Sequence, residues 1–175
     1  MFREKRLIRR INAGDPHVWR QLYNLYKDDM MTLAKALLFD REMAEDVVHD
    51  VFVQLVQQRE SLHIKRNLRA YLLSAAANTA RRINCKKKPI LTQLPDTESL
   101  IASPEHVLSQ QEWQDRLARA LVQLPYEQRE VVLLRHYGNL KFKTIGEIFA
   151  VSTNTIQGRY RYGLRKLKSL LEGSL

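Results

Sequence analysis

Hydrophobic side chains recur every three or four positions along most of this chain, and no segment shows the two-residue alternation of a half-buried β-strand. This spacing predicts amphipathic helices. In the first half of the chain the expected helices cover about residues 2–12, 16–39, 41–58 and 68–84. In the second half they cover about residues 104–124, 125–138, 141–149 and 153–171. We therefore predict an all-α fold.

Residues suited to capping stand at several of these boundaries. Asp15, Asp40, Asn67 and Ser152 each precede an expected helix, and their short polar side chains can accept a hydrogen bond from its first turn. Gly138 stands at the end of the helix over 125–138, where a glycine often takes a left-handed conformation. These signals predict where the helices begin and end.

The helix over 68–84 has one apolar stripe, which we expect to face the core. Its members are Leu68, Tyr71, Leu72, Ala75, Ala76, Thr79 and Ile83. The side chains that fall outside this stripe, and are expected to be exposed, are Arg69, Leu73, Asn78, Arg81 and Arg82.

A linker is expected between the two halves. Residues 85–104 hold three of the five prolines, together with several Ser, Thr and Asp side chains. This divides the chain into two small helical domains, residues 1–84 and residues 105–175. Twenty extended residues reach about 65 Å, roughly two turns of duplex DNA.

Charge is distributed in blocks. The 175 residues hold 29 Lys and Arg against 19 Asp and Glu, which gives a formal net charge of +10. Residues 61–88 have eight basic side chains and no acidic one, and residues 131–175 have eight basic and two acidic. Residues 89–130 between them are net acidic. Two separated basic blocks favour two contacts with one polyanion, whose binding should weaken strongly with salt.

Composition also excludes several classes of protein. The single cysteine, Cys85, cannot form an internal disulfide or a thiolate metal cage, which is typical of a reducing compartment. No apolar run is long enough to span a bilayer, and the first residues lack the apolar core of a secretory signal. We expect a cytoplasmic protein with no membrane insertion of its own.

The strongest local pattern lies at residues 140–168, where a short helix, a tight turn at Ala150 and a longer helix follow one another. These are the parts of a DNA-reading helix-turn-helix. The longer helix should project Asn and Gln, which pair with adenine edges, and Arg, which pairs with guanine or phosphate. The expected outward side chains are Thr153, Asn154, Gln157, Arg161 and Arg165.

A different chemistry marks the helix over 41–58. Residues 40–50 contain five acidic side chains and one basic one. Such a face would repel phosphates, so it favours a protein partner over DNA.

Four segments together resemble the extracytoplasmic-function (ECF) sigma factors of bacterial RNA polymerase. They are residues 44–55, 67–78, 124–131 and 140–168, and their order and spacing match the group over nearly the whole chain. The resemblance implies an alternative sigma factor that binds core polymerase, directs it to promoters and helps to melt the −10 element. It implies no catalysis and no cofactor or metal. The implied partners are the clamp helices of the largest polymerase subunit, the flap of the second subunit, promoter DNA and an anti-sigma factor.

The same resemblance assigns three sets of residues. The core-polymerase set is Glu45, Asp46, His49, Asp50, Val53 and Gln54. The −10 set is Lys65, Arg66, Asn67, Tyr71, Asn78 and Arg81. The −35 set is Thr153, Asn154, Gln157, Arg159, Arg161 and Arg165.

Two other classes remain open on residue chemistry alone. Asp46, His49 and Asp50 have the spacing to touch one metal ion, as in a metal-dependent enzyme, but no recognised catalytic motif is present. A dimeric helix-turn-helix regulator would explain residues 140–168 but would not need the acidic helix. A sigma factor differs from both because it confers promoter selection on core polymerase.

Overall fold

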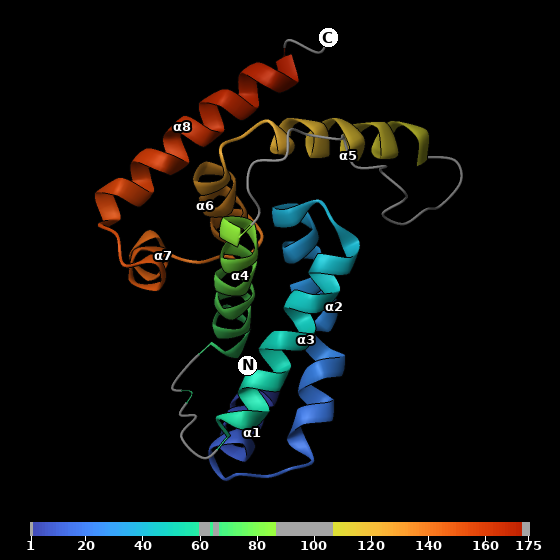
Figure 1. Ribbon diagram of the computed structural model, residues 1–175, viewed down its shortest axis with the longest axis vertical. Helices are drawn as coiled ribbons and strands as arrows, with labels where there is room; N and C mark the ends of the chain where they lie inside the picture. The colour runs from blue at the N-terminus through green and yellow to red at the C-terminus, as the bar shows by residue number, and fades with distance from the viewer. Residues whose placement is uncertain (1, 60–63, 65–66, 87–106, 173–175) are drawn as a thin grey trace.

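The computed structural model describes residues 2–59, 64, 67–86 and 107–172, which form eight helices and no strand (Figure 1). The first four are α1 (Phe2–Asn12), α2 (Val18–Leu38), α3 (Arg41–Gln57) and α4 (Leu68–Lys86). The last four are α5 (Val107–Val122), α6 (Tyr126–His136), α7 (Phe142–Phe149) and α8 (Thr153–Glu172). The predicted all-α fold is confirmed.

Three of the predicted caps form. Asp40 accepts a hydrogen bond from the Met43 amide at 3.0 Å, and the Asn67 and Ser152 side chains cap α4 and α8 in the same way. Asp15 instead accepts from the His17 amide and pairs with Arg10 at 2.6 Å, and α2 begins at Val18. The proline after Asp15 therefore lies in the turn before the helix.

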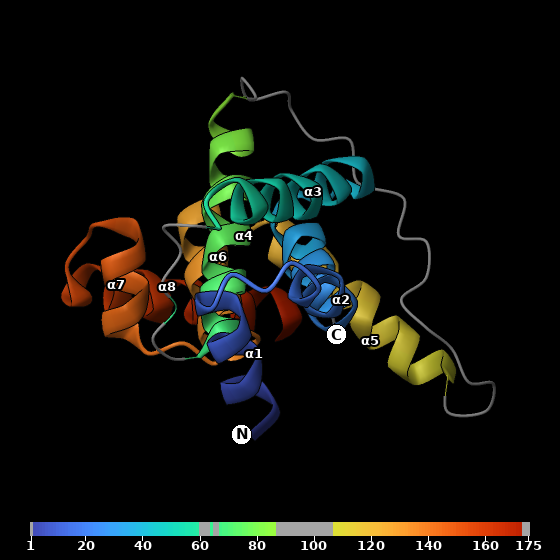
Figure 2. The same ribbon diagram turned by 90° about the horizontal axis from the view of Figure 1, so that it is seen from below.

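The first module (α1–α4) is a bundle in which α2, α3 and α4 pack on one another and α1 covers one end (Figures 1 and 2). Its buried side chains come from the apolar stripes, for example Leu22, Met30, Val47 and Leu72. These side chains are aliphatic and almost wholly removed from water, which is the main driving force for folding.

Two expectations for α4 were wrong. Tyr71, predicted to face the core, is 36% exposed. Leu73, predicted to be exposed, is only 1% exposed. The reason is that α4 is covered on two sides, by α2 and α3 and also by α6 and α7. Arg69, Leu73 and Arg81 lie along this second side, and the two arginines contact the second module there.

The second module (α5–α8) contains the predicted helix-turn-helix, α7 and α8. Ile145 and Ile156 are fully buried where these helices meet, and Ala150 has the left-handed φ of 53° that the turn requires. A Cβ on Gly146 would come within 2.8 Å of the Val151 carbonyl oxygen, so the crossing needs a glycine.

The end of α6 differs from the prediction. The left-handed residue is Asn139, with φ of 51°, and not Gly138. Gly138 is required for another reason, because a Cβ there would lie 2.6 Å from the Leu134 carbonyl oxygen.

The two modules share one hydrophobic core. Val131, Leu134 and Ile145 of the second module belong to the same buried cluster as the side chains of α2, α3 and α4. The first module's last helix, α4, reaches Lys86, beyond the predicted boundary at residue 84. Most of the expected linker lies outside the described residues, and so does residue 104, where the next helix was expected to begin.

Candidate protein and nucleic-acid interfaces

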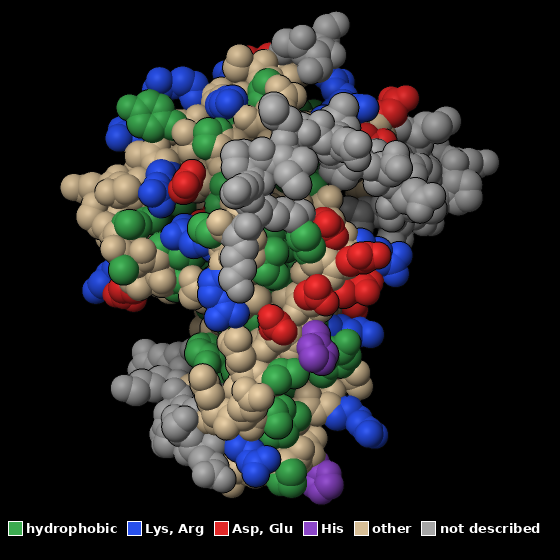
Figure 3. Space-filling view, in the orientation of Figure 1, with side chains coloured by type: hydrophobic (Ala, Val, Ile, Leu, Met, Phe, Trp, Pro, Cys, Tyr) green, Lys and Arg blue, Asp and Glu red, His purple; other side chains and the backbone are tan. Residues whose placement is uncertain are grey.

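The acidic face of α3 is open to solvent. Glu45, Asp46, His49 and Asp50 are exposed, and Glu45 pairs with Arg41 at 3.0 Å. Figure 3 shows acidic side chains gathered over the first part of this helix. Asp40 caps the start of the helix. This face is directed outward because Ala44, Val47 and Val51 on the opposite side are buried. The face therefore presents carboxylates without a core role.

An apolar groove of about 680 Å³ runs beside this face, between α2 and α3. Its walls include Tyr23, Val53 and Val56, which are exposed although they are hydrophobic. Gln54, by contrast, is half-buried and does not line the groove. An apolar groove with a charged rim is the usual form of a protein-binding site. Sequence reasoning missed Tyr23 and Val56. The signal that could have found them is that each is an apolar residue outside the buried stripe of its helix.

The exposed side of α4 presents polar and aromatic groups. Asn67, Tyr71 and Asn78 are exposed and lie within about 40° of one another around the helix axis. Asn67 has a left-handed φ of 51° and caps the helix by accepting from the Ala70 amide at 3.0 Å. Arg82, which was not in the predicted set, lies on the same side and is exposed. Lys65 and Arg66 lie outside the described residues.

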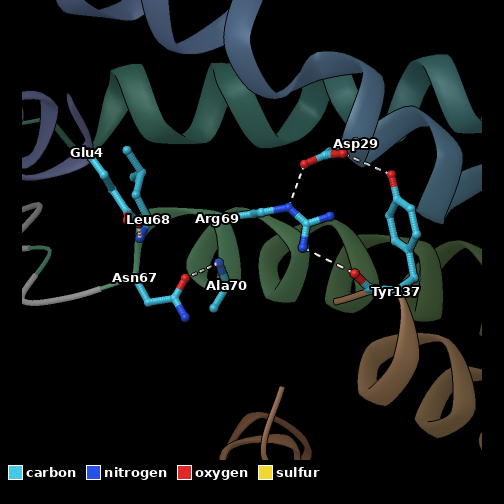
Figure 4. A network of polar contacts seen from close by, with 7 residues as sticks. All are labelled: Glu4, Asp29, Asn67, Leu68, Arg69, Ala70 and Tyr137. Atoms are coloured by element: carbon cyan, nitrogen blue, oxygen red, sulfur yellow. Dashed lines mark hydrogen bonds and ion pairs between the residues drawn. The ribbon is translucent and has the colours of Figure 1, made fainter. Parts of the chain in front are cut away.

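On the opposite side of α4, Arg69 links three elements (Figure 4). Its Nε donates to Asp29 at 2.6 Å and its Nη1 donates to the Tyr137 carbonyl oxygen at 3.1 Å. The Tyr137 hydroxyl donates to the other oxygen of Asp29 at 3.0 Å. Partial burial raises the pKa of Asp29, but the hydrogen bonds from Arg69 and Tyr137 outweigh it and hold the pKa below its usual value. The network joins α2, α4 and the end of α6.

Arg81, predicted to contact DNA, is instead bonded to the second module. Its Nε donates to Glu130 at 3.2 Å, its Nη2 makes a second bond to the same carboxylate, and its guanidinium lies 3.8 Å from the centre of the Phe149 ring. The Glu130 side chain is fully buried. Burial raises the pKa of Glu130 to about 7, although Arg81 opposes this shift. Arg81 is therefore not among the free groups of α4 in this arrangement.

A third contact joins the two modules near the start of α6. Arg129 is almost entirely buried, and its Nη2 donates to the Leu37 carbonyl oxygen at 2.8 Å. Its guanidinium also stacks on Phe39 and Tyr126. Two buried charged residues, Arg129 and Glu130, thus lie between the modules.

The outer side of α8 matches the prediction at most positions. Asn154, Gln157, Arg161 and Arg165 are exposed, and no acidic side chain occurs in α8 before Glu172. Thr153 is half-buried at the start of the helix. Arg159 departs from the prediction, because its Nη1 is buried without a hydrogen-bond partner and its charge lies close enough to lower the pKa of Glu130. Arg159 therefore points toward the module's interior.

Within the described residues, no group of three or more His, Cys, Asp and Glu side chains could hold a metal ion. No described helix is long and apolar enough to cross a membrane.

Comparisons with known proteins assign both modules. The family models of sigma-70 region 2 and sigma-70 region 4 match residues 22–87 and 120–169. A similar curated protein is the ECF RNA polymerase sigma factor SigW of Bacillus subtilis, 26% identical over 95% of this chain and 96% of that protein. The chain belongs to the ECF sigma factors of the sigma-70 family.

Two solved structures share the fold of this sigma factor. One is CnrH in complex with the cytosolic domain of CnrY, with a TM-score of 0.69 and 19% identity over 97% of both chains. The other is RpoE in complex with the anti-sigma factor NepR from Bartonella quintana. Its TM-score is 0.65 at 20% identity, over 87% of this chain and 96% of that one.

Membership settles the class of activity. An ECF sigma factor is an alternative sigma factor, a non-catalytic initiation factor that binds DNA and regulates transcription. The matched ranges correspond to α2–α4 and to the end of α5 through α8, so each module contains one sigma region. Helix α1 and most of α5 lie outside both matches.

Proposed function

We propose that this sigma factor binds core polymerase through α3 and the α2–α3 groove, and promoter DNA through α4 and α8. The supporting observation is the segregation of charge. The exposed carboxylates cluster on α3, whereas the outer side of α8 has amides and arginines and no acid until its last residue. Carboxylates repel phosphates, so the α3 face does not suit DNA, whereas the α4 and α8 surfaces do.

On this proposal the polymerase contact has two parts. The carboxylates of Glu45, Asp46 and Asp50 provide charge complementarity, and Val53 with the groove provides apolar area. His49 and Gln54 complete the set. The resemblance to ECF sigma factors points to the clamp helices of the largest subunit for this module and to the flap of the second subunit for the other.

The −10 contact would be made by the exposed side of α4 and the segment before it. Asn67, Tyr71 and Asn78 can hydrogen-bond and stack with unpaired bases. Lys65 and Arg66 would add phosphate contacts. Protein contacts of this kind offset the few kcal/mol needed to extrude a base.

The −35 contact would be made by α8. Asn154 and Gln157 have the amides that pair with adenine edges, and Arg161 and Arg165 can reach guanine or phosphate. Thr153 at the helix start would contact a phosphate. Arg159 would support the helix from within the module.

We also propose that the packed arrangement is the free state, and that the modules separate on polymerase. Arg81 supports this, because the group assigned to the −10 strand is occupied by Glu130 while the modules are packed. Small-angle scattering should show expansion for Arg81→Glu, which places two acids together. The double variant Arg81→Glu with Glu130→Arg should restore compactness. Equal compactness of all three proteins would contradict the proposal.

An anti-sigma factor is the expected inhibitor. The fold neighbours CnrH and RpoE were solved with CnrY and the anti-sigma factor NepR. The exposed apolar side chains of the α2–α3 groove give such a partner a place to bind in competition with polymerase. We place this regulation in the cytoplasm, where core polymerase acts.

Transcription in vitro is the direct test. Purified core enzyme with this protein should initiate from a discrete set of sequences in a promoter library, with conserved positions near −35 and −10. Core enzyme alone is the control. Initiation without sequence preference, or none, would overturn the proposed DNA contacts.

A further inference from the structure

Helix α1 holds the peptide that leads into α4. The Asn12 side chain makes two hydrogen bonds to one residue 52 positions away: its Nδ2 donates to the Ile64 carbonyl oxygen, and its Oδ1 accepts from the Ile64 amide, both at 3.2 Å. Ile64 is only 4% exposed. A side-chain amide that pairs with both polar groups of one residue fixes the position and the direction of that peptide.

A second attachment lies four residues further on. The Leu68 amide, at the first position of α4, donates to Oε1 of Glu4 at 2.6 Å (Figure 4). A carboxylate is well suited to a helix start, where amides lack partners within the helix. Glu4 and Asn12 lie on one broad side of α1, and Leu7 and Ile11 on that side are buried in the core.

Asn67 lies between these two attachments. Its backbone is left-handed, its side chain caps α4, and its surface is exposed. The Asn67 side chain satisfies the Ala70 amide in the first turn of α4, and the Leu68 side chain is fully buried. The hydrogen bonds from α1 therefore add orientation to a helix that is anchored without them.

We propose that Glu4 and Asn12 are positioning residues for the −10 strand, because they hold Ile64 and Leu68 so that Asn67 is presented in one fixed backbone conformation. The inference rests on the proposed role of Asn67 in −10 recognition. A site that is already ordered loses less conformational entropy when a strand binds. The family model for region 2 begins at residue 22, so neither positioning residue lies within it.

The experiment measures discrimination between a preferred and a mismatched single-stranded −10 oligonucleotide by the holoenzyme. Asn12→Ala removes both bonds to Ile64 and should reduce the discrimination ratio about tenfold. Asn12→Asp keeps only the acceptor, and its discrimination ratio should fall between those of the parent protein and Asn12→Ala. Glu4→Ala should reduce the ratio, and Glu4→Gln, which keeps an acceptor oxygen, should restore most of it.

Controls separate positioning from folding. Asn24→Ala changes an exposed asparagine on α2 and should leave the ratio unchanged. Affinity for core enzyme and for a −35 duplex should stay within about twofold of the parent for every α1 variant. If the α1 variants lose discrimination only to the extent that they also lose core affinity and thermal stability, then α1 is merely structural. That result would overturn the proposal. If Asn12→Ala fails to fold, the comparison of Glu4→Ala with Glu4→Gln still tests the proposal.

Asn67→Ala distinguishes the two levels of the proposal. If it lowers discrimination and the α1 variants do not, the positioning role is wrong and the −10 site stands. If Asn67→Ala also leaves discrimination unchanged, the proposed −10 function of this end of α4 is wrong, and the positioning role falls with it.

Discussion

The guanidinium of Arg81 in α4 is bonded through Nε and Nη2 to the carboxylate of Glu130 in α6, 49 residues further along the chain. The arginine is partly accessible and the glutamate is fully buried. A single carboxylate of the second module thus pairs with a cation that the proposed function assigns to the −10 strand. On that proposal, the stability of the packed arrangement and DNA binding depend on the same side chain.

Loss of Arg81 should destabilise the protein more than loss of its neighbour. Arg81→Ala leaves the Glu130 carboxylate buried without its partner, and we expect the free energy of unfolding to fall by about 2–4 kcal/mol. Arg82→Ala removes an exposed cation from the same turn and should stay within about 0.5 kcal/mol. Urea denaturation measures both values. Similar losses would show that the buried pair has no special role.

Stability should depend on Glu130 between about pH 4.5 and pH 7. Burial raises its pKa from 4.5 to about 7, with Arg81, Arg159 and Glu127 as its charged neighbours. The folded state therefore binds the proton more tightly than the unfolded state, so the free energy of unfolding should decrease as pH rises through this window. The expected decrease is on the order of 2–3 kcal/mol. Glu130→Gln should flatten this part of the pH profile, and an unchanged profile would contradict the assignment.

Charge reversal on α3 should weaken the polymerase contact without unfolding the protein. Asp46→Lys with Asp50→Lys changes two exposed side chains that make no core contact. We expect at least a tenfold loss of affinity for core enzyme, since like-charge contacts across an interface cost several kcal/mol. Glu112→Lys, an exposed acid on α5, is the control. Fluorescence anisotropy with labelled protein measures the binding, and circular dichroism checks the fold.

Replacing a side chain on the outer side of α8 by alanine should weaken −35 recognition and leave core binding unchanged. Gln157→Ala or Arg161→Ala should lower discrimination against a mismatched −35 duplex by about 1–3 kcal/mol, while affinity for core enzyme stays the same. Lys166→Ala, also exposed but about 120° around the helix from Asn154, should not change discrimination. If the parent protein transcribes equally from native and −35-mutant promoters, α8 does not read sequence.

Two glycines in the helix-turn-helix should respond oppositely to alanine. Gly146→Ala places a Cβ 2.8 Å from the Val151 carbonyl oxygen, and the backbone must shift, at about 1–3 kcal/mol. Gly158→Ala adds a Cβ with no atom within 4 Å, and should stabilise α8 by about 0.5–1 kcal/mol. Thermal denaturation compares the two variants, and a shift of the same sign in both would contradict this reading of the turn.

The features that sequence predicted correctly are mostly local. The caps at Asp40, Asn67 and Ser152 involve neighbours three residues away, and the turn at Ala150 follows from the helices on either side. The sigma-factor family itself was predicted correctly from four motifs.

Contacts between distant segments could not be predicted in this way. Leu73 looked exposed because one apolar stripe accounts for packing on one side of a helix, whereas α4 is covered on two sides. Arg129 and Glu130 are buried although charged residues are usually exposed. The docking of the modules provides Arg81 as the partner of Glu130, and it adds the Leu37 carbonyl oxygen to the partners that Arg129 has within its own module. The pairing of Arg81 with Glu130 and the burial of the Arg159 Nη1 could not be predicted for the same reason, because both arise from tertiary structure.

The hydrogen bonds from α1 bear on how chimeric sigma factors should be built. A chimera cut at the start of the region 2 match would combine Glu4 and Asn12 from one parent with Ile64 and Leu68 from another. Residues 64 and 68 contribute only main-chain groups, so the outcome depends on the residues at positions 4 and 12. On the proposal above, a hybrid whose α1 lacks Glu4 and Asn12 would load onto polymerase yet open promoters poorly, and a hybrid that keeps both residues would not.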